Sequence, residues 1–143
     1  MGFCCRILDV TMKKRILGFS VVILSFGGLY LISQIYLQGY YLFKWTAANS
    51  YAYIWIIALA LICFNKICIS ISLTIGNITG ILLGQFWGDF IRNQNMVKIT
   101  ADMEGWQVHK LTHHPGVEIW LLTICVFVLI GVVGNVFLTK DRK

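Results

Sequence analysis

The chain has 143 residues, of which 58% are hydrophobic and only 13% are charged. A soluble domain carries about 25% charged residues, so this composition excludes an ordinary water-soluble globule. The formal net charge of +6 does not indicate nucleic-acid binding, because the basic residues stand at the ends of apolar segments. We therefore expect one integral membrane domain over residues 1–143, with the lipid bilayer as its surroundings and no nucleic-acid partner.

The first apolar segment, residues 16–37, contains no charged residue. At about 1.5 Å per residue it is long enough to cross about 30 Å of hydrocarbon. Lys13, Lys14 and Arg15 precede it directly. A signal peptide has a shorter apolar region followed by a small-residue cleavage site, so we expect this helix to be retained.

The next segment, residues 45–91, is too long for one crossing, and Asn65 and Lys66 form a polar pair near its middle. A lysine at the bilayer centre costs at least about 2.5–3.5 kcal/mol. A turn at this pair avoids that cost and predicts two transmembrane helices, at 45–64 and 67–91. The alternative is that Lys66 stays buried in the membrane as a functional charge.

Residues 92–116 form the one long polar segment and hold all three histidines. Within it we expect a short interfacial helix, capped by Thr100 or Asp102 and ending before Pro115. The last apolar segment, residues 117–139, is predicted to be the fourth transmembrane helix.

The distribution of basic residues predicts the orientation. With four crossings, one side receives Lys44, Arg92, Lys98 and Lys110. The side of the termini receives a larger set: Arg6, Lys13, Lys14, Arg15, Lys66, Lys140, Arg142 and Lys143. The positive-inside rule then places both termini in the cytoplasm. The expected fold is an all-α bundle of four transmembrane helices in the plasma membrane, with an extracytoplasmic polar loop.

A glycine repeat marks the predicted third helix. Its members recur every four residues: Gly76, Gly80, Gly84 and Gly88. Each glycine costs about 1 kcal/mol relative to alanine inside a helix, whereas small residues at this spacing let two membrane helices approach closely. We interpret the repeat as a packing face, with Gly131 and Asn135 as a smaller one on the fourth helix. The partner is either a helix of this chain, a second copy or another protein.

Polar residues flank this glycine repeat on the same helix: Thr74, Asn77, Gln85, Asp89 and Arg92. Polar side chains at membrane depth face protein or water. They form either hydrogen bonds between helices or the lining of a path for a substrate or ion. Asp89 and Arg92, three residues apart, are placed to pair with each other.

His109 and His113 are four residues apart, and His114 is beside them. On a helix the first two share one face and would hold a transition metal. The alternative is an exposed loop with titratable histidines. We expect no other cofactor.

These features favour a subunit of a membrane transporter or channel complex that packs through the glycine repeat. A self-contained homo-oligomeric channel or carrier is one alternative. A regulatory or immunity-type protein that senses a ligand through the histidine loop is another. We do not expect an enzyme, although intramembrane catalysis stays open, and no motif indicates a particular family.

Overall fold

The computed structural model describes residues 2–49 and 51–140, with side chains placed for residues 12–48 and 52–137. The described residues form helices and no strand, which confirms the all-α prediction. In chain order the helices are α1 (Gly2–Ile35), α2 (Tyr41–Asn49), α3 (Tyr51–Cys63), α4 (Ile67–Met96), α5 (Gly105–Thr112) and α6 (Gly116–Lys140).

Three helical segments are long and apolar enough to cross a membrane: Met12–Ile35, Ile67–Met96 and Gly116–Phe137. Their length and composition are those of an integral membrane protein. A fourth crossing is present only if Tyr41–Ala48 and Ala52–Cys63, which are bent by 64°, count as one span.

The single helix expected at 45–64 is therefore wrong, because α2 and α3 meet at a bend. The hydroxyl of Thr46 in α2 donates to the carbonyls of Leu42 and Phe43, at 2.8 and 3.2 Å. Such back-bonding competes with the regular helical pattern and often bends helices. The amide of Leu42 is held by the side chain of Gln85 in α4, at 2.7 Å. These contacts hold the first turns of α2 against α4.

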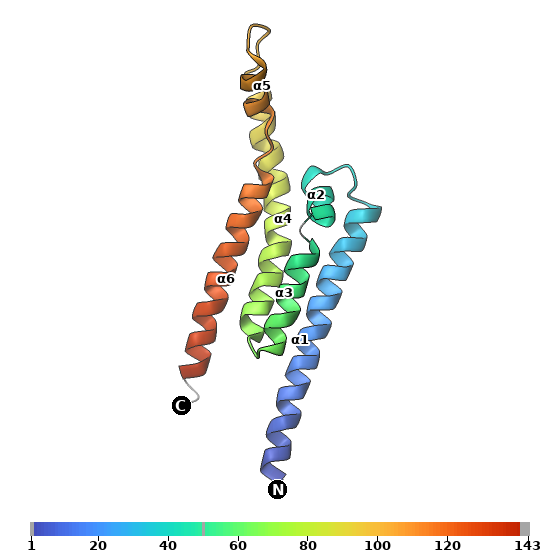
Figure 1. The fold of residues 1–143 in the computed structure, drawn as a ribbon, viewed down its shortest axis with the longest axis vertical. Helices are drawn as coiled ribbons and strands as arrows, with labels where there is room; N and C mark the ends of the chain where they lie inside the picture. Colours follow the sequence, from blue (N-terminus) through green and yellow to red (C-terminus); the bar gives the residue numbers. More distant parts are fainter. Residues whose placement is uncertain (1, 50, 141–143) are drawn as a thin grey trace.

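Helix α4 is the central helix of the bundle. Figure 1 shows α6 on one side of it and α3, followed by α1, on the other, with the start of α1 and the end of α6 at the same end. The buried apolar core combines five helices: Val22, Phe26, Leu42, Phe43, Ala58, Ile62, Leu73, Ile81, Trp120 and Ile124.

The turn between α3 and α4 confirms the prediction at Asn65 and Lys66. Asn65 has φ 61°, a left-handed conformation that asparagine tolerates better than most residues. Lys66 is exposed in this turn, which favours the turn over the alternative of a buried lysine. The Nε of Arg15 in α1 donates to Asn65 Oδ1 at 2.9 Å and ties α1 to the turn.

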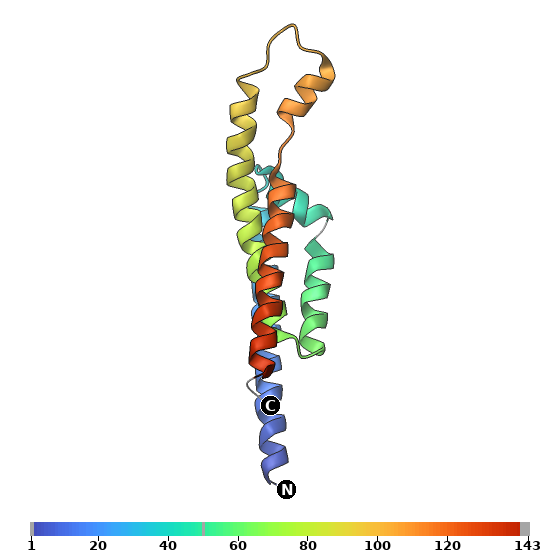
Figure 2. The same cartoon turned by 90° about the vertical axis from the view of Figure 1, so that its left-hand side faces the viewer.

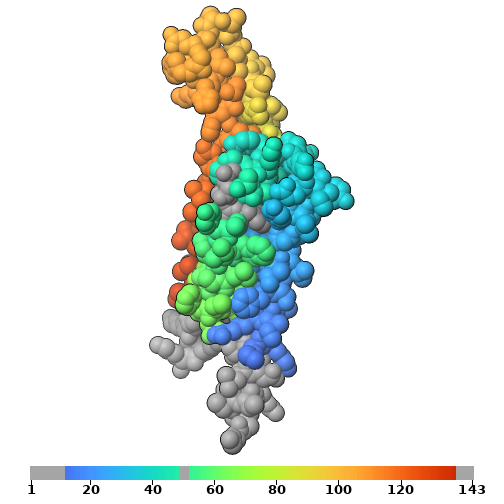
Figure 3. Space-filling model, turned by 45° about the vertical axis from the view of Figure 1, so that its right-hand side comes forward, coloured from blue at the N-terminus to red at the C-terminus, as the bar shows by residue number. Residues whose placement is uncertain are grey.

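Beyond the bundle, the chain forms a projecting arm, defined here as residues 89–114. It consists of the last part of α4, a loop and α5, and it rises past the ends of the other helices (Figures 2 and 3). Helix α4 runs to Met96, five residues beyond the predicted end. The cap of α5 is Glu104, which forms a reciprocal pair with Gln107, so neither Thr100 nor Asp102 caps it.

The left-handed turn gives a first testable prediction. We expect Asn65→Ala to destabilise the protein by about 1–2 kcal/mol, because a Cβ without a compensating polar group is strained at this φ. Asn65→Gly is the control, since it also removes the hydrogen bond to Arg15 but relieves the strain. Thermal unfolding in detergent measures the difference, and equal melting temperatures for the two variants would contradict the strain at this position.

Candidate functional site

The glycine repeat of α4 faces α6 of the same chain. All four of its glycines are buried. A Cβ added to Gly84 would lie 2.5 Å from the carbonyl oxygen of Gly116, and one added to Gly116 would lie 2.8 Å from the carbonyl oxygen of Gly84. At Gly76 an added Cβ would lie 2.7 Å from Cβ of Phe127. The partner of the repeat, which the sequence left open, is therefore α6.

The smaller packing face on α6 is nearer its carboxyl end. A Cβ added to Gly131 would lie 2.8 Å from Cβ of Ser72 in α4. Asn135 is half-buried one turn further along α6. The contact between α4 and α6 thus extends from the start of α6 to Gly131, and it is the most extensive helix–helix contact among the described residues.

The glycine repeat ends at a buried histidine. The side chain of His114 is 4% exposed and lies between Gly88 and Gly116, since a Cβ added to either glycine would collide with the imidazole ring. The ring of Tyr41 lies over it, with ring centroids 4.7 Å apart. Two glycines and one aromatic ring therefore shape a close-fitting pocket for this imidazole.

A chain of hydrogen bonds joins His114 to α4 and α2. The amide of Gly116 donates to His114 Nδ1 at 3.1 Å, and His114 Nε2 lies 3.2 Å from Asp89 Oδ1. Because Nδ1 accepts, a neutral ring carries its proton on Nε2 and donates it to Asp89. The other oxygen of Asp89 accepts from Gln85 Nε2 at 2.6 Å, and Gln85 Oε1 accepts from the amide of Leu42 at 2.7 Å. We call Leu42, Gln85, Asp89, His114 and Gly116 the arm-base cluster.

This cluster corrects the expected pairing of Asp89 with Arg92. Within the described residues, Asp89 contacts Gln85 and His114 instead, and the buried Nε of Arg92 has no partner. The spacing along one helix predicted a local pair, but the chain returns from the arm and places an imidazole beside the carboxylate.

The other polar residues of α4 form hydrogen bonds inside the bundle. The hydroxyl of Thr74 donates to the carbonyl of Ser70 at 2.9 Å. Asn77 Oδ1 accepts from Nε1 of Trp120 in α6 at 3.0 Å, while Asn77 Nδ2 is buried without a partner among the described residues. Sequence reasoning missed Trp120. The sequence did contain a signal for this contact: Trp120 places an indole N–H inside an apolar segment, and a buried indole N–H needs a hydrogen-bond acceptor.

The three histidines lie in different surroundings. Helix α5 ends at Thr112 and His113 has an extended backbone, so His109 and His113 do not share a helix face as expected. His113 Nε2 lies 2.8 Å from Glu118 Oε1, both exposed, whereas His114 is buried against Asp89. In the described part of the chain no group of three or more His, Cys, Asp or Glu side chains is arranged to hold a metal ion. A metal at these histidines stays a prediction.

The close contact of α4 with α6 predicts opposite effects of alanine at two glycines. Gly134→Ala meets open space, and we expect it to raise stability by up to about 1 kcal/mol through helix propensity. Gly84→Ala collides with the backbone of α6, and we expect a net loss of about 1–3 kcal/mol. Unfolding in detergent measures both, and a stabilised Gly84→Ala protein would contradict the contact.

The arm-base cluster predicts a difference between neighbouring histidines. His114→Ala removes the partner of the buried Gly116 amide, which costs about 1–3 kcal/mol if the amide stays buried. It also removes the imidazole from Asp89, which keeps only its bond from Gln85. His113→Ala removes only an exposed pair, worth at most about 1 kcal/mol. Hydrogen exchange of residues 105–113 should therefore accelerate in His114→Ala and stay unchanged in His113→Ala. Equal exchange in both variants would show that His114 does not hold the arm.

Chemically, the arm-base cluster offers one carboxylate whose side chain is 41% exposed and one imidazole that is shielded from solvent. Both ring nitrogens of the imidazole have partners within the chain, so the arrangement suits holding the arm in place. No protein-family model, curated protein or solved structure matches the chain.

Proposed function

We propose that the chain is a subunit of a membrane transporter or channel complex and that it engages its partner through the arm. The observation that carries this proposal is the exposure of large apolar side chains on the arm. Val97 is 87% exposed and Trp106 is 63% exposed. Large apolar side chains that stay exposed outside the membrane are suited to contact with a partner protein.

The arm lies outside the hydrocarbon by its length and polarity. Residues 67–88 of α4 already extend about 33 Å at about 1.5 Å per residue, which matches the hydrocarbon thickness of about 30 Å. The helix then continues with a run of polar residues: Asp89, Arg92, Asn93, Gln94 and Asn95. Lipid therefore does not account for the exposed side chains beyond this point.

The glycine repeat is not the surface that recruits the partner. Its glycines contact α6 of the same chain, and no second helix fits against them while α6 is in place. The part of the sequence-based hypothesis that assigned the partner contact to this repeat is corrected accordingly. The arm takes over that role in the proposal.

The polar row of α4 supports a role in transport. Thr74, Asn77 and Gln85 are buried at membrane depth, where polar side chains are costly and are commonly functional. The Nδ2 of Asn77 keeps an unused donor in this row. Because Thr74, Asn77 and Gln85 form hydrogen bonds within the bundle, a path along this helix in the proposed complex requires that these bonds be exchanged for bonds to the substrate or ion.

The proposal also includes the location and topology of the chain. It places the protein in the plasma membrane, with four crossings and both termini in the cytoplasm. The bent pair α2 and α3 then counts as one crossing. The arm is extracytoplasmic in this arrangement. Support comes from the basic residues near the start of α1 and at the turn before α4, which share one end of the bundle.

The proposal predicts a site-specific cross-link. With a photoreactive amino acid at Trp106, we expect a covalent adduct to a different membrane protein when cells are irradiated. The matched control carries the same group at Leu129 of α6, which is 65% exposed on a membrane span and is expected to react with lipid. Mass spectrometry of the purified adducts identifies the product.

Two outcomes count against this assignment. Adducts of twice the chain mass at position 106, together with flux in liposomes that hold only this chain, would favour the homo-oligomeric channel. A chain that forms no adduct at position 106 and purifies as a monomer in mild detergent would contradict a complex of any kind.

A further inference from the structure

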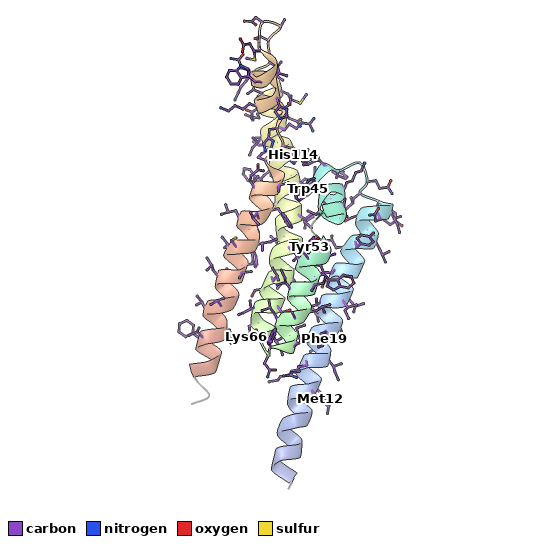
Figure 4. All side chains as sticks on the ribbon, in the orientation of Figure 1. Met12, Phe19, Trp45, Tyr53, Lys66 and His114 are labelled. Atoms are coloured by element: carbon purple, nitrogen blue, oxygen red, sulfur yellow. The ribbon has the colours of Figure 1, made fainter. Side chains whose placement is uncertain are left out.

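Basic side chains from two separate segments meet at the end of the bundle opposite the arm. Arg15 lies on α1 and Lys66 lies in the turn before α4, and the bond from Arg15 Nε to Asn65 Oδ1 holds these segments together at 2.9 Å. Figure 4 shows Lys66 at the end of the α3–α4 pair, beside α1. Lys14 and Lys66 are exposed and Arg15 is half-buried. We call Lys14, Arg15 and Lys66 the basic cluster.

The described structure offers no carboxylate to neutralise this cluster. The described side chains with carboxylates all lie in the arm or at the start of α6: Asp89, Asp102, Glu104 and Glu118. Among the described side chains, the carboxylates therefore lie toward the arm, and none lies beside Lys14, Arg15 and Lys66. Such a cluster attracts an anion from outside the chain.

Exposed apolar side chains are adjacent in sequence to the residues of the basic cluster. Ile16 and Leu17, which directly follow Arg15, are 61% and 66% exposed, and Phe64 before the turn is 75% exposed. Cations at a border with exposed apolar side chains match a phospholipid, whose phosphate lies above its acyl chains.

The guanidinium of Arg15 is suited to a phosphate. Its Nε is held by Asn65, which fixes the orientation of the planar group, while its two terminal nitrogens are further donors. A guanidinium fixed in this way binds phosphate oxygens through two parallel hydrogen bonds. The exposed ammonium groups of Lys14 and Lys66 add further positive charge to the cluster.

We propose that the basic cluster is a binding site for the headgroup of an anionic phospholipid. The phosphate contacts Arg15 and Lys66, and the acyl chains lie along Ile16 and Phe64. This inference needs the membrane location of the chain but not its role in a transport complex, so the two proposals fail independently.

Native mass spectrometry of the full chain in detergent tests this site. Phosphatidylglycerol and phosphatidylcholine with the same acyl chains are added in equal amounts, and we expect more phosphatidylglycerol adducts on the wild-type chain. The double variant Arg15→Gln with Lys66→Gln should lower the ratio of the two adducts by roughly five-fold or more. Equal adducts on the wild-type chain would overturn the proposal.

Matched variants separate the site from overall charge and from misfolding. Lys98→Gln with Lys110→Gln removes the same charge from the arm and should leave the adduct ratio unchanged. Arg15→Lys with Lys66→Arg keeps the charges and should keep most of the preference. A loss of preference in the arm variant as large as in the cluster variant would overturn the proposal. Displacement of phosphatidylglycerol by added inorganic phosphate would also overturn it, because the ligand would then be soluble phosphate.

Discussion

The architecture depends on the close approach of α4 and α6. At the point where Gly84 meets Gly116, either glycine with a side chain would place a carbon against the backbone of the other helix. Lipid gives membrane helices no hydrophobic reason to associate, so dispersion contacts between close backbones and hydrogen bonds across the interface must hold them together. The glycines of α4 supply the first, and the bond between Trp120 and Asn77 supplies the second.

This contact also determines where the arm stands. Because α6 begins at Gly116, against the glycine repeat, the residue two positions earlier is brought over Gly88, and that residue is His114. The imidazole then joins the returning chain to Asp89, and through Gln85 to the start of α2. One packed interface thereby places the arm, orients α2 and buries a titratable group where the membrane span of α4 ends.

The features of the fold that depend on local sequence patterns could be predicted from the sequence. The lengths of the apolar segments indicated α1, α4 and α6, because hydrocarbon thickness sets a minimum length for a crossing. The polar pair Asn65 and Lys66 indicated a turn, because a lysine is costly at the bilayer centre. The spacing of the glycines indicated a close helix contact. It did not indicate which helix packs against the glycines, because the spacing describes only one of the two surfaces in contact.

What the sequence did not predict depends on contacts between distant residues. Asp89 was expected to pair with Arg92 on the same helix, whereas its partner is 25 positions away. The start of α2 is held by the side chain of Gln85, 43 positions from Leu42. The cap of α5 was sought at Thr100 or Asp102, the usual capping types, whereas the pairing of Glu104 with Gln107 decides where the helix begins.

Disulfide cross-linking tests the intramolecular contact of α4 with α6 most directly. A Cβ on Gly80 would lie 3.3 Å from Cβ of Thr123, near the separation of about 3.5–4.5 Å that a disulfide needs. In a chain whose native cysteines are replaced by serine, Gly80→Cys with Thr123→Cys should form a disulfide within one chain on oxidation in membranes. Covalent dimers instead, or no cross-link, would contradict the packing of these two helices within one molecule.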